Sequence, residues 1–417
     1  MDNLEPQKRQ ADFSREAMRP EVQLILACAR TSIDAEKASL IKELSQQPLD
    51  WTYILNKVNQ HHILPLFYLN INALCSENVP KESLQRLRFD YLSHAQYNLL
   101  LTRELIQLLR LFEAQNIQAL PLKGPVLAAT IYKNLSHRQF ADLDILVRER
   151  DFHKARAILK NRGYESASPL GALQRIAPLI SRQKDQIFMS ADGNIRVELH
   201  WRLTGRHFAF PIKMTLLWKH LEKVKVSGFG VNSLPGTELL LYLCMHGSRH
   251  GWERLQWICD IAEFIKLHPE IDWEDIWNKA QALGNERNLA LGLLLAIEFL
   301  DAQVPKTVVN KINNDSIVKT LIIQICELIY SEDVASSDIS HWLAYHLKMK
   351  ERIQDRVKIR LHYYLRYVRI ATSPTVHDRA FVMLPNSLTF LYYVLRPIRL
   401  AKIYGSALLT RIRKTLG

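Results

Sequence analysis

The chain has 417 residues and a net charge of +13, and 48% of its residues are apolar, which is too much length and apolar content for one compact core. The scarcity of glycine (14) and proline (16) argues against a glycine-rich β architecture; the polar residues 1–19 exclude a secretory signal, and no run of about 18 uncharged apolar residues exists to span a membrane. Five widely spaced cysteines without a C-x-x-C pair are expected to be buried thiols of a cytoplasmic protein.

Helical patterns dominate the first 115 residues. Asp50 precedes a helix-period pattern that begins at Trp51, and a second apolar segment covers residues 64–74. Residues 84–115 then predict one long amphipathic helix. We expect its core stripe to consist of apolar side chains at helical spacing: Leu99, Leu100, Leu105, Leu108, Leu109 and Phe112.

The pattern changes at residue 116, where short apolar segments replace the long helical ones. Residues 117–122 predict a buried strand that ends at the turn Lys123-Gly124, and Pro125 suits the first turn of a following helix. A second strand is expected over residues 140–147 and a helix over 151–162. Residues 187–190 and 195–201 predict two strands joined through Asp192-Gly193, a strong hairpin signal.

Helical patterns return after Pro235. Helices are predicted over 238–246, 252–267, 273–283, 287–300, 308–330, 340–367 and 387–396. The expected fold is therefore α+β, with a small mixed sheet flanked by mostly helical regions. We expect four parts: an N-terminal helical region (1–115), an α/β core (116–225), a helical domain (226–345) and a basic helical C-terminal region (346–417).

Two aspartates in the second strand carry the strongest functional signal. Side chains alternate between the faces of a strand, so Asp142 and Asp144 would share one face while Leu143 and Ile145 occupy the other. Two like charges on an otherwise apolar strand repel each other and lose hydration, a cost that a divalent cation removes. Oxygen ligands favour Mg²⁺ or Mn²⁺ over Zn²⁺. A solvated edge or surface ion pairs are the structural alternative.

A third carboxylate is expected from the hairpin. In residues 195–201, Arg196, Glu198 and His200 share a face, while Val197 and Leu199 point to the core. If this strand lies beside the aspartate strand, Glu198 completes a cluster of three acids that can hold two metal ions. The chain contains no P-loop pattern, no G-x-G-x-x-G after a strand and no G-x-S-x-G elbow.

These residues resemble the uncharacterised bacterial branch of the DNA polymerase beta-like nucleotidyltransferase superfamily. The resemblance rests on Leu122-Lys123-Gly124, Tyr132, the segment Arg138 to Val147, Gly163-Tyr164 and the segment Val197 to Trp201. Weaker likeness extends to Asp50-Trp51, to the region from His246 to Asp260, and to Leu395-Arg396-Pro397, so it covers most of the chain.

The resemblance implies a role for several residues. Asp142, Asp144 and Glu198 would be the catalytic and metal-binding acids, with Glu198 also the base for the acceptor. Lys123, Gly124 and Arg138 would contact the triphosphate. This chain departs from the wider superfamily in its Gly124-Pro125 turn, because proline removes one N–H donor and puts backbone phosphate binding there in doubt.

Four further residues are expected to face the substrate: His200, His246, His250 and Asp260. His246 and His250 stand four residues apart, a spacing that also suits zinc with Asp260 as third ligand. However, the H-E-x-x-H pattern is absent, and Gly247 and Gly251 weaken a helix there. Ordinary packed or capping residues are the remaining alternative.

The basic C-terminal region holds nearly the whole charge excess. From Lys348 to the end there are 15 Lys or Arg and three acids, a net charge of +12. Arginines alternate there with tyrosines between residues 360 and 399. Three interpretations stay open: a solvated face packed by tyrosines, a site for an anionic partner or membrane surface, and a nucleic-acid surface.

The expected function is magnesium-dependent transfer of a nucleoside monophosphate from a nucleoside triphosphate, such as ATP, to an unknown acceptor. The acceptor would be a small molecule, a peptide or RNA. Two alternatives remain. One is a toxin- or antitoxin-type nucleotidyltransferase that acts on tRNA or protein, and the other is a non-catalytic interaction protein that retains the fold.

Overall fold

A computed structural model describes residues 18–167, 184–330 except 206, 207, 209 and 213, 339–372, 378 and 382–400. The N-terminal helices match the expected pattern. They are α1 (Pro20–Cys28), α2 (Ala35–Ser45), α3 (Trp51–Gln60), α4 (Leu64–Leu74) and α5 (Lys81–Ala114), with a short 3₁₀ turn at Ser76–Asn78. Asp50 caps α3, because its carboxylate accepts a 2.9 Å hydrogen bond from the Tyr53 amide.

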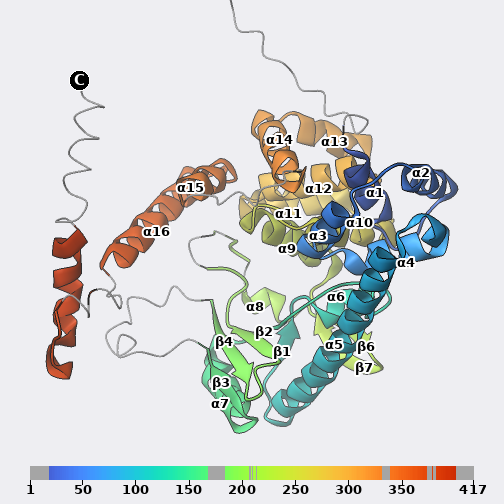
Figure 1. The fold of residues 1–417 in the computed structure, drawn as a ribbon. Coiled ribbons are helices and arrows are strands. Elements are labelled where there is room, and N and C mark those ends of the chain that lie inside the picture. The colour runs from blue at the N-terminus through green and yellow to red at the C-terminus, as the bar shows by residue number, and fades with distance from the viewer. Residues whose placement is uncertain are drawn as a thin grey trace, which may run out of the picture.

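The 34-residue helix α5 touches both hydrophobic cores of the protein. Leu87, near its start, belongs to a core made mainly of helices. Its later residues Leu101, Leu105 and Phe112 belong to a second core beneath the sheet. Figure 1 shows α5 running from the helical layer past the sheet. The expected stripe needs one correction: Leu99 and Leu100 are 59% and 44% exposed, because the buried face runs through Asn98 and Leu101 and leaves these two leucines outside it.

The sheet has five strands in the order β1-β2-β5-β4-β3. Their bounds are β1 (Ala119–Pro121), β2 (Leu143–Val147), β3 (Tyr164–Ser166), β4 (Asp185–Ser190) and β5 (Arg196–His200). Strands β2 and β5 are parallel and the other neighbours are antiparallel, which confirms a mixed sheet in an α+β fold. The strand expected over 140–147 begins only at Leu143, so Asp142 lies just before it.

Two helices accompany the sheet, α6 (Pro125–Thr130) and α7 (Phe152–Asn161), with a 3₁₀ turn at Glu149–Asp151 before α7. A second, two-stranded sheet of β6 (Glu222–Val226) and β7 (Phe229–Ser233) was not predicted. It adjoins β1, where the Asn232 amide donates a 2.7 Å hydrogen bond to the Ala119 carbonyl. The short helix α8 (Met214–Leu217) precedes it.

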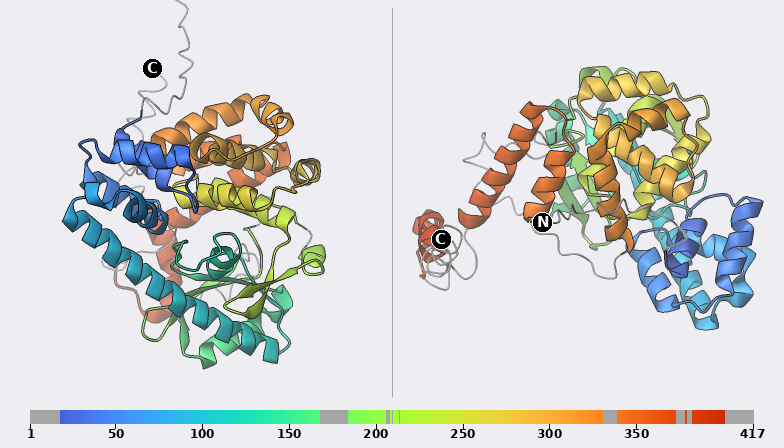
Figure 2. Two further views of the ribbon diagram at one scale, coloured as in Figure 1. Left: turned by 90° about the vertical axis from the view of Figure 1, so that its right-hand side faces the viewer. Right: turned by 90° about the horizontal axis from the view of Figure 1, so that it is seen from above.

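The remaining helices are α9 (Gly236–Arg249), α10 (Leu255–Leu267), α11 (Trp273–Leu283), α12 (Glu286–Leu300), α13 (Lys306–Asn313), α14 (Ser316–Tyr330), α15 (Ile339–Lys348) and α16 (Ile353–Thr372), followed by a 3₁₀ segment, Asn386–Leu391, and helix 392–400. Of these, α9 to α14 form the helical layer on the other side of the sheet, whereas α15, α16 and the last helix extend away from it (Figures 1 and 2). Two expected helices, 308–330 and 340–367, are each divided in two. Asp315 explains the first break, because its carboxylate accepts from the Ile317 amide and so caps α14.

The two faces of the sheet belong to different cores, which decides where charged side chains are tolerated. Leu143, Ile145 and Val147 point into the core shared with α5 and α7, whereas Leu146 joins the core of the helical layer. Asp144 alternates with the first set and so faces the helical layer. All five cysteines are free and buried. The domain boundaries at 115/116, 225/226 and 345/346 stay predictions.

No helix within the described residues is both long and apolar enough to cross a membrane. The end of the basic C-terminal region, residues 401–417, lies outside the described part of the chain, as does Ser373-Pro374.

Candidate active site

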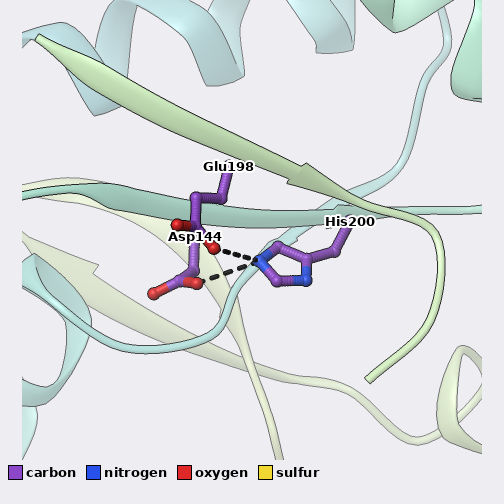
Figure 3. A group of neighbouring side chains, drawn as sticks. All are labelled: Asp144, Glu198 and His200. Atoms are coloured by element: carbon purple, nitrogen blue, oxygen red, sulfur yellow. Dashed lines mark hydrogen bonds and ion pairs between the residues drawn. The ribbon is translucent and has the colours of Figure 1, made fainter. Parts of the chain in front are cut away.

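The parallel pairing of β2 and β5 brings two of the expected acids together. Asp144 is in register with Glu198, and Leu146 is in register with His200. Since alternate residues of a strand share a face, Asp144, Glu198 and His200 point to the same side of the sheet (Figure 3). The expectation that Glu198 lies beside the aspartate strand is therefore met by the strand order itself.

His200 lies between the two carboxylates. Its Nε2 is 2.9 Å from Asp144 Oδ1 and 3.6 Å from Glu198 Oε2, as Figure 3 shows. The ligand atoms of Asp144, Glu198 and His200 all lie within 4.8 Å of one another. Within the described part of the chain, they form the only set of three such side chains. The sequence placed His200 on this face as a substrate-facing residue but did not predict that it joins the acid group.

Lys123 supplies the opposite charge from the turn that follows β1. Its Nζ lies 2.9 Å from Asp144 Oδ2, and its side chain is 17% exposed. The turn continues through Gly124, whose φ of 57° and ψ of −122° suit glycine and disfavour residues with a Cβ. A Cβ there would make only an ordinary contact with the Asp142 carbonyl, at 3.6 Å. The backbone conformation of the lysine turn, rather than lack of space, is therefore what favours glycine.

Asp142 adds a third carboxylate at the start of β2. Burial first, and then repulsion from Asp144, raise the pKa of Asp142 to about 6, although Lys123 opposes the shift. Glu198 also raises this pKa, so the charge of Asp142 is felt by both other acids. Asp142 is not part of the tight group with His200.

The other two acids are held in their charged forms. Burial penalises the charge of Asp144, but Lys123 and His200 outweigh it and hold its pKa well below the usual value. Burial and Asp144 likewise oppose the charge of Glu198, yet His200 and Arg196 lower its pKa to about 2. Arg196 is ion-paired with Glu198 from the same strand. A pKa this low keeps Glu198 charged but makes it a poor proton acceptor at neutral pH.

The donor set fits a divalent cation. Asp144 and Glu198 lie together in a largely buried place, with Lys123 and Arg196 as their paired cations, and burial together with repulsion from these acids raises the pKa of Asp142 just before β2. Carboxylate oxygens are the ligands that Mg²⁺ and Mn²⁺ prefer, while an imidazole nitrogen suits Mn²⁺ better than Mg²⁺.

Arg138 and Asp260 form a separate, closed ion pair. Arg138 Nε and Nη2 donate to the two Asp260 oxygens at 2.8 Å each, and the Tyr132 hydroxyl donates to Asp260 Oδ1 at 2.8 Å. Both charged side chains are at most 4% exposed. The pair attaches the segment before Asp142 to α10, so Arg138 and Asp260 are engaged with each other. Their expected contacts with phosphate and substrate stay predictions that this burial does not favour.

His246 and His250 lie at the end of α9 in an aromatic cluster with Tyr242 and Trp257. The two imidazole centroids are 4.8 Å apart, and Trp257 lies 5.4 and 5.3 Å from them. Burial, with the nearby charge of Lys123 contributing, holds the pKa of His246 well below its usual range. Burial and Arg249 lower that of His250 to about 2. Both rings are therefore neutral, within electrostatic reach of Lys123.

Two cations near the acids were missed by the sequence analysis. Lys184 precedes β4, is ion-paired with Asp185, and lies 3.4 Å from His200 Nδ1. Lys184 comes close to His200 because the register of β4 against β5 pairs Asp185 with His200, and no local sequence pattern predicts that register. Arg254 directly precedes α10, and burial lowers its pKa, while the charge of Asp142 acts in the opposite direction.

A mixed sheet that carries a lysine-glycine turn and paired strand carboxylates is the arrangement that the sequence predicted for a nucleotidyltransferase fold. The chain belongs to the family described as "uncharacterised nucleotidyltransferase", whose profile matches residues 47–301. None of the curated proteins matches. Among solved structures, a crystal structure of an antigenic nucleotidyltransferase-like protein from Paracoccidioides brasiliensis is similar at 15% identity and a TM-score of 0.29, covering 49% of this chain and 96% of that one.

Proposed function

We propose that this protein transfers a nucleoside monophosphate from a nucleoside triphosphate to an acceptor hydroxyl, and that it requires Mg²⁺ or Mn²⁺. The observation that carries the proposal is the register of Asp144 with Glu198 on parallel strands, with Asp142 immediately before β2. When bound, the cation would neutralise the carboxylates, polarise the phosphates and lower the pKa of the attacking hydroxyl.

We assign the metal-binding and substrate-binding roles to separate residues of the chain. Asp142, Asp144 and Glu198 would hold the cation, and the low pKa of Glu198 supports a ligand role over a proton-accepting one. Lys123 would pair with a phosphate once Asp144 is otherwise neutralised, because its Nζ already lies at the acid group. Gly124 would let the phosphates approach the backbone. Arg254 and the neutral His246 and His250 would bound the substrate space.

The test is incubation of the full chain with labelled nucleoside triphosphates, Mg²⁺ and candidate acceptors, followed by pyrophosphate release and product analysis. We expect transfer by the wild type and none by Asp142→Ala/Asp144→Ala. Glu222→Gln, at an exposed acid on β6, is the matched control and should keep full activity. Transfer that persists in the double variant would overturn the proposal. Triphosphate binding without transfer to any acceptor would favour the non-catalytic alternative.

The partner that we propose for the basic C-terminal region is an anionic membrane surface. Ile353, Val357 and Leu361 follow one another at four-residue spacing along α16 and are 76%, 55% and 50% exposed. The helix projects from the body (Figure 2), and the region from Lys348 onward carries +12. An apolar row with basic residues is typical of interfacial helices, whereas phosphate contacts to nucleic acid need no exposed aliphatic row.

Vesicle cosedimentation tests this partner. We expect the full chain to bind vesicles of phosphatidylserine and phosphatidylcholine but not of phosphatidylcholine alone, and Val357→Ser/Leu361→Ser to weaken that binding. Leu99→Ser, at a comparably exposed leucine on α5, is the control. Equal binding to both kinds of vesicle, or salt-sensitive binding to RNA in place of anionic vesicles, would overturn it.

A further inference from the structure

A cavity of about 600 Å³ opens where β2 and β5 end. This volume lies in the range of small-molecule sites. Its walls come from the residues after both strands, from the α8 region and from the first turns of α16. The lining includes three aromatic side chains and several arginines, among them Trp201, Phe210, Trp218, Arg148, Arg202 and Arg352.

The cavity lies along the same strands as the acid group. Arg148 is the fourth residue after Asp144, so strand alternation carries the face of Asp144 through Leu146 toward Arg148. The Arg148 guanidinium lies over the Trp218 ring, which places this cavity wall on the acid-bearing side of the sheet. Trp201 follows His200 on the opposite face, where its ring packs edge-on against Phe152 with the two centroids 4.5 Å apart. At about 3.3 Å per residue, the cavity begins roughly 13 Å from the carboxylates.

The phosphate-side residues lie at the other end of β2. Strand β1 runs antiparallel to β2, and the Leu122 amide donates to the Asp144 carbonyl at 3.0 Å, so the Lys123-Gly124 turn lies by the start of β2. The acids thus stand between this turn and the cavity. In phosphoryl transfer the attacking and leaving oxygens are roughly in line through phosphorus. With pyrophosphate on the lysine side, the attacking group would come from the cavity side.

The charges of the cavity favour an anionic ligand with a flat body. The Arg148 guanidinium lies 5.0 Å from the centroid of the Trp218 ring and donates to the neutral Gln118 amide at 2.8 Å. Arg352 donates to two backbone carbonyls at 2.9 Å. Among the described residues, neither arginine has a carboxylate partner, whereas Arg202 is paired with Glu149. The lining holds five cationic side chains and two acids, Glu149 and Asp355, so its net charge is positive. The Arg148 guanidinium beside the Trp218 indole suits an anion attached to an aromatic group.

We propose that this cavity holds the acceptor, an extended molecule with an aromatic body, an anionic group and a hydroxyl that reaches the acids. The inference rests on the proposed transferase activity and names its acceptor class. The acceptor oxygen forms a bond to the α-phosphorus. The bond from that phosphorus to the bridging oxygen breaks, its electron pair leaves with pyrophosphate, and the hydroxyl proton passes to solvent. The nucleobase of the triphosphate is the competing occupant.

Two dyes of the same shape serve as probes: 8-anilino-1-naphthalenesulfonate, which is anionic, and N-phenyl-1-naphthylamine, its analogue without the sulfonate. We expect Arg148→Gln to weaken binding of the anionic dye about tenfold or more and to leave the neutral dye within about twofold. Arg88→Gln, on the exposed face of α5, is the matched control and should change neither. Trp218→Leu should weaken both dyes, and circular dichroism checks its folding.

Calorimetry with ATP and Mg²⁺ separates this proposal from the proposed function. Two results together would support an acceptor site: Arg148→Gln binds ATP as tightly as the wild type does, and ATP does not displace the anionic dye from the wild type. Weaker ATP binding in Arg148→Gln, or competition between ATP and the dye, would assign the cavity to the nucleobase and overturn the inference. The inference would also be overturned if Arg148→Gln bound the anionic dye as tightly as the wild type does. If the wild type binds no triphosphate, the proposed function fails, whatever the dyes show.

Discussion

Two buried aspartates of this protein are held in opposite ways. Asp260 faces one guanidinium with bidentate geometry and one hydroxyl, so its charge is matched. Asp144 faces Lys123, but Glu198 and Asp142 add two more negative charges to the same place. The first carboxylate is paired with a single cation, whereas the second belongs to a cluster of several acids and cations that includes Glu198, Lys123 and Arg196. Burial alone therefore does not distinguish the two carboxylates, and the number of charged groups gathered around each one does.

The largest effect is expected at the acid cluster. Asp144→Asn should lower transfer activity about a thousandfold, the scale seen when one preorganised electrostatic group is removed from an active site. Steady-state assays of pyrophosphate release measure it, with Glu222→Gln as control. Activity of Asp144→Asn within tenfold of the wild type would contradict this prediction, because Asp144 would then be no more important for transfer than a purely structural residue.

Replacing residues of the Arg138–Asp260 pair should change the free energy of unfolding. Arg138→Met leaves Asp260 buried without its cation and should lower the free energy of unfolding by about 3–5 kcal/mol. Arg138→Met/Asp260→Leu should recover most of that loss, because no unpaired charge remains. Urea unfolding measures both. Arg162→Met, at the partly exposed pair with Glu104, is the control and should cost about 1 kcal/mol or less. A stable Arg138→Met that fails to bind triphosphate would restore the phosphate role predicted from sequence.

Addition of Mg²⁺ should stabilise the protein through the acid cluster and not through the Arg138–Asp260 pair. At a Mg²⁺ concentration 100 times its dissociation constant, the free energy of unfolding should rise by about 2.7 kcal/mol. Arg138→Met/Asp260→Leu should keep this gain and Asp144→Asn should lose it. Thermal unfolding in Mg²⁺ and in EDTA gives the difference. An equal gain in Asp144→Asn would show that the cation binds elsewhere.

The smallest effect is expected on the free energy of unfolding when Asp142, whose pKa is raised by burial and by Asp144, is replaced in the absence of metal, that is, in EDTA. Its pKa of about 6 in the folded protein exceeds the unfolded value of about 3.9, so its stabilising contribution is full below pH 4 and is lost as pH rises through 6. Asp142→Asn should therefore be about 1–2 kcal/mol more stable than the wild type at pH 7 and should lack that part of the pH dependence. Urea unfolding at pH 4, 5, 6 and 7 tests this. A destabilised Asp142→Asn at pH 7 would contradict it.

Local alternation was enough to predict part of the site. Arg196, Glu198 and His200 alternate with apolar residues in β5, so their common face followed from the sequence, and the resemblance supplied the pairing with the aspartate strand. The position of His200 between the acids was not predicted, because it depends on the register of β2 against β5. A shift of one residue would turn every side chain to the other face.

Long-range pairing explains most of what the sequence did not reveal. Arg138 and Asp260 are 122 residues apart, and no periodic pattern connects them. The β6–β7 hairpin is different, because its signal was present. Ser227 and Gly228 both adopt positive φ, 48° and 79°, as a two-residue hairpin turn requires, and glycine at the second position was readable.

Helix α5 has a consequence for any attempt to isolate the part of the chain that carries the sheet. At about 1.5 Å per residue its 34 residues span roughly 51 Å, and its two halves are embedded in different cores. A fragment that starts at residue 116 would strip the sheet of Leu101, Leu105, Leu108 and Phe112, leaving its underside bare to water. The smallest autonomous unit must therefore retain this helix, and with it the apolar surface of its first half, which only the helical layer can shield from aggregation.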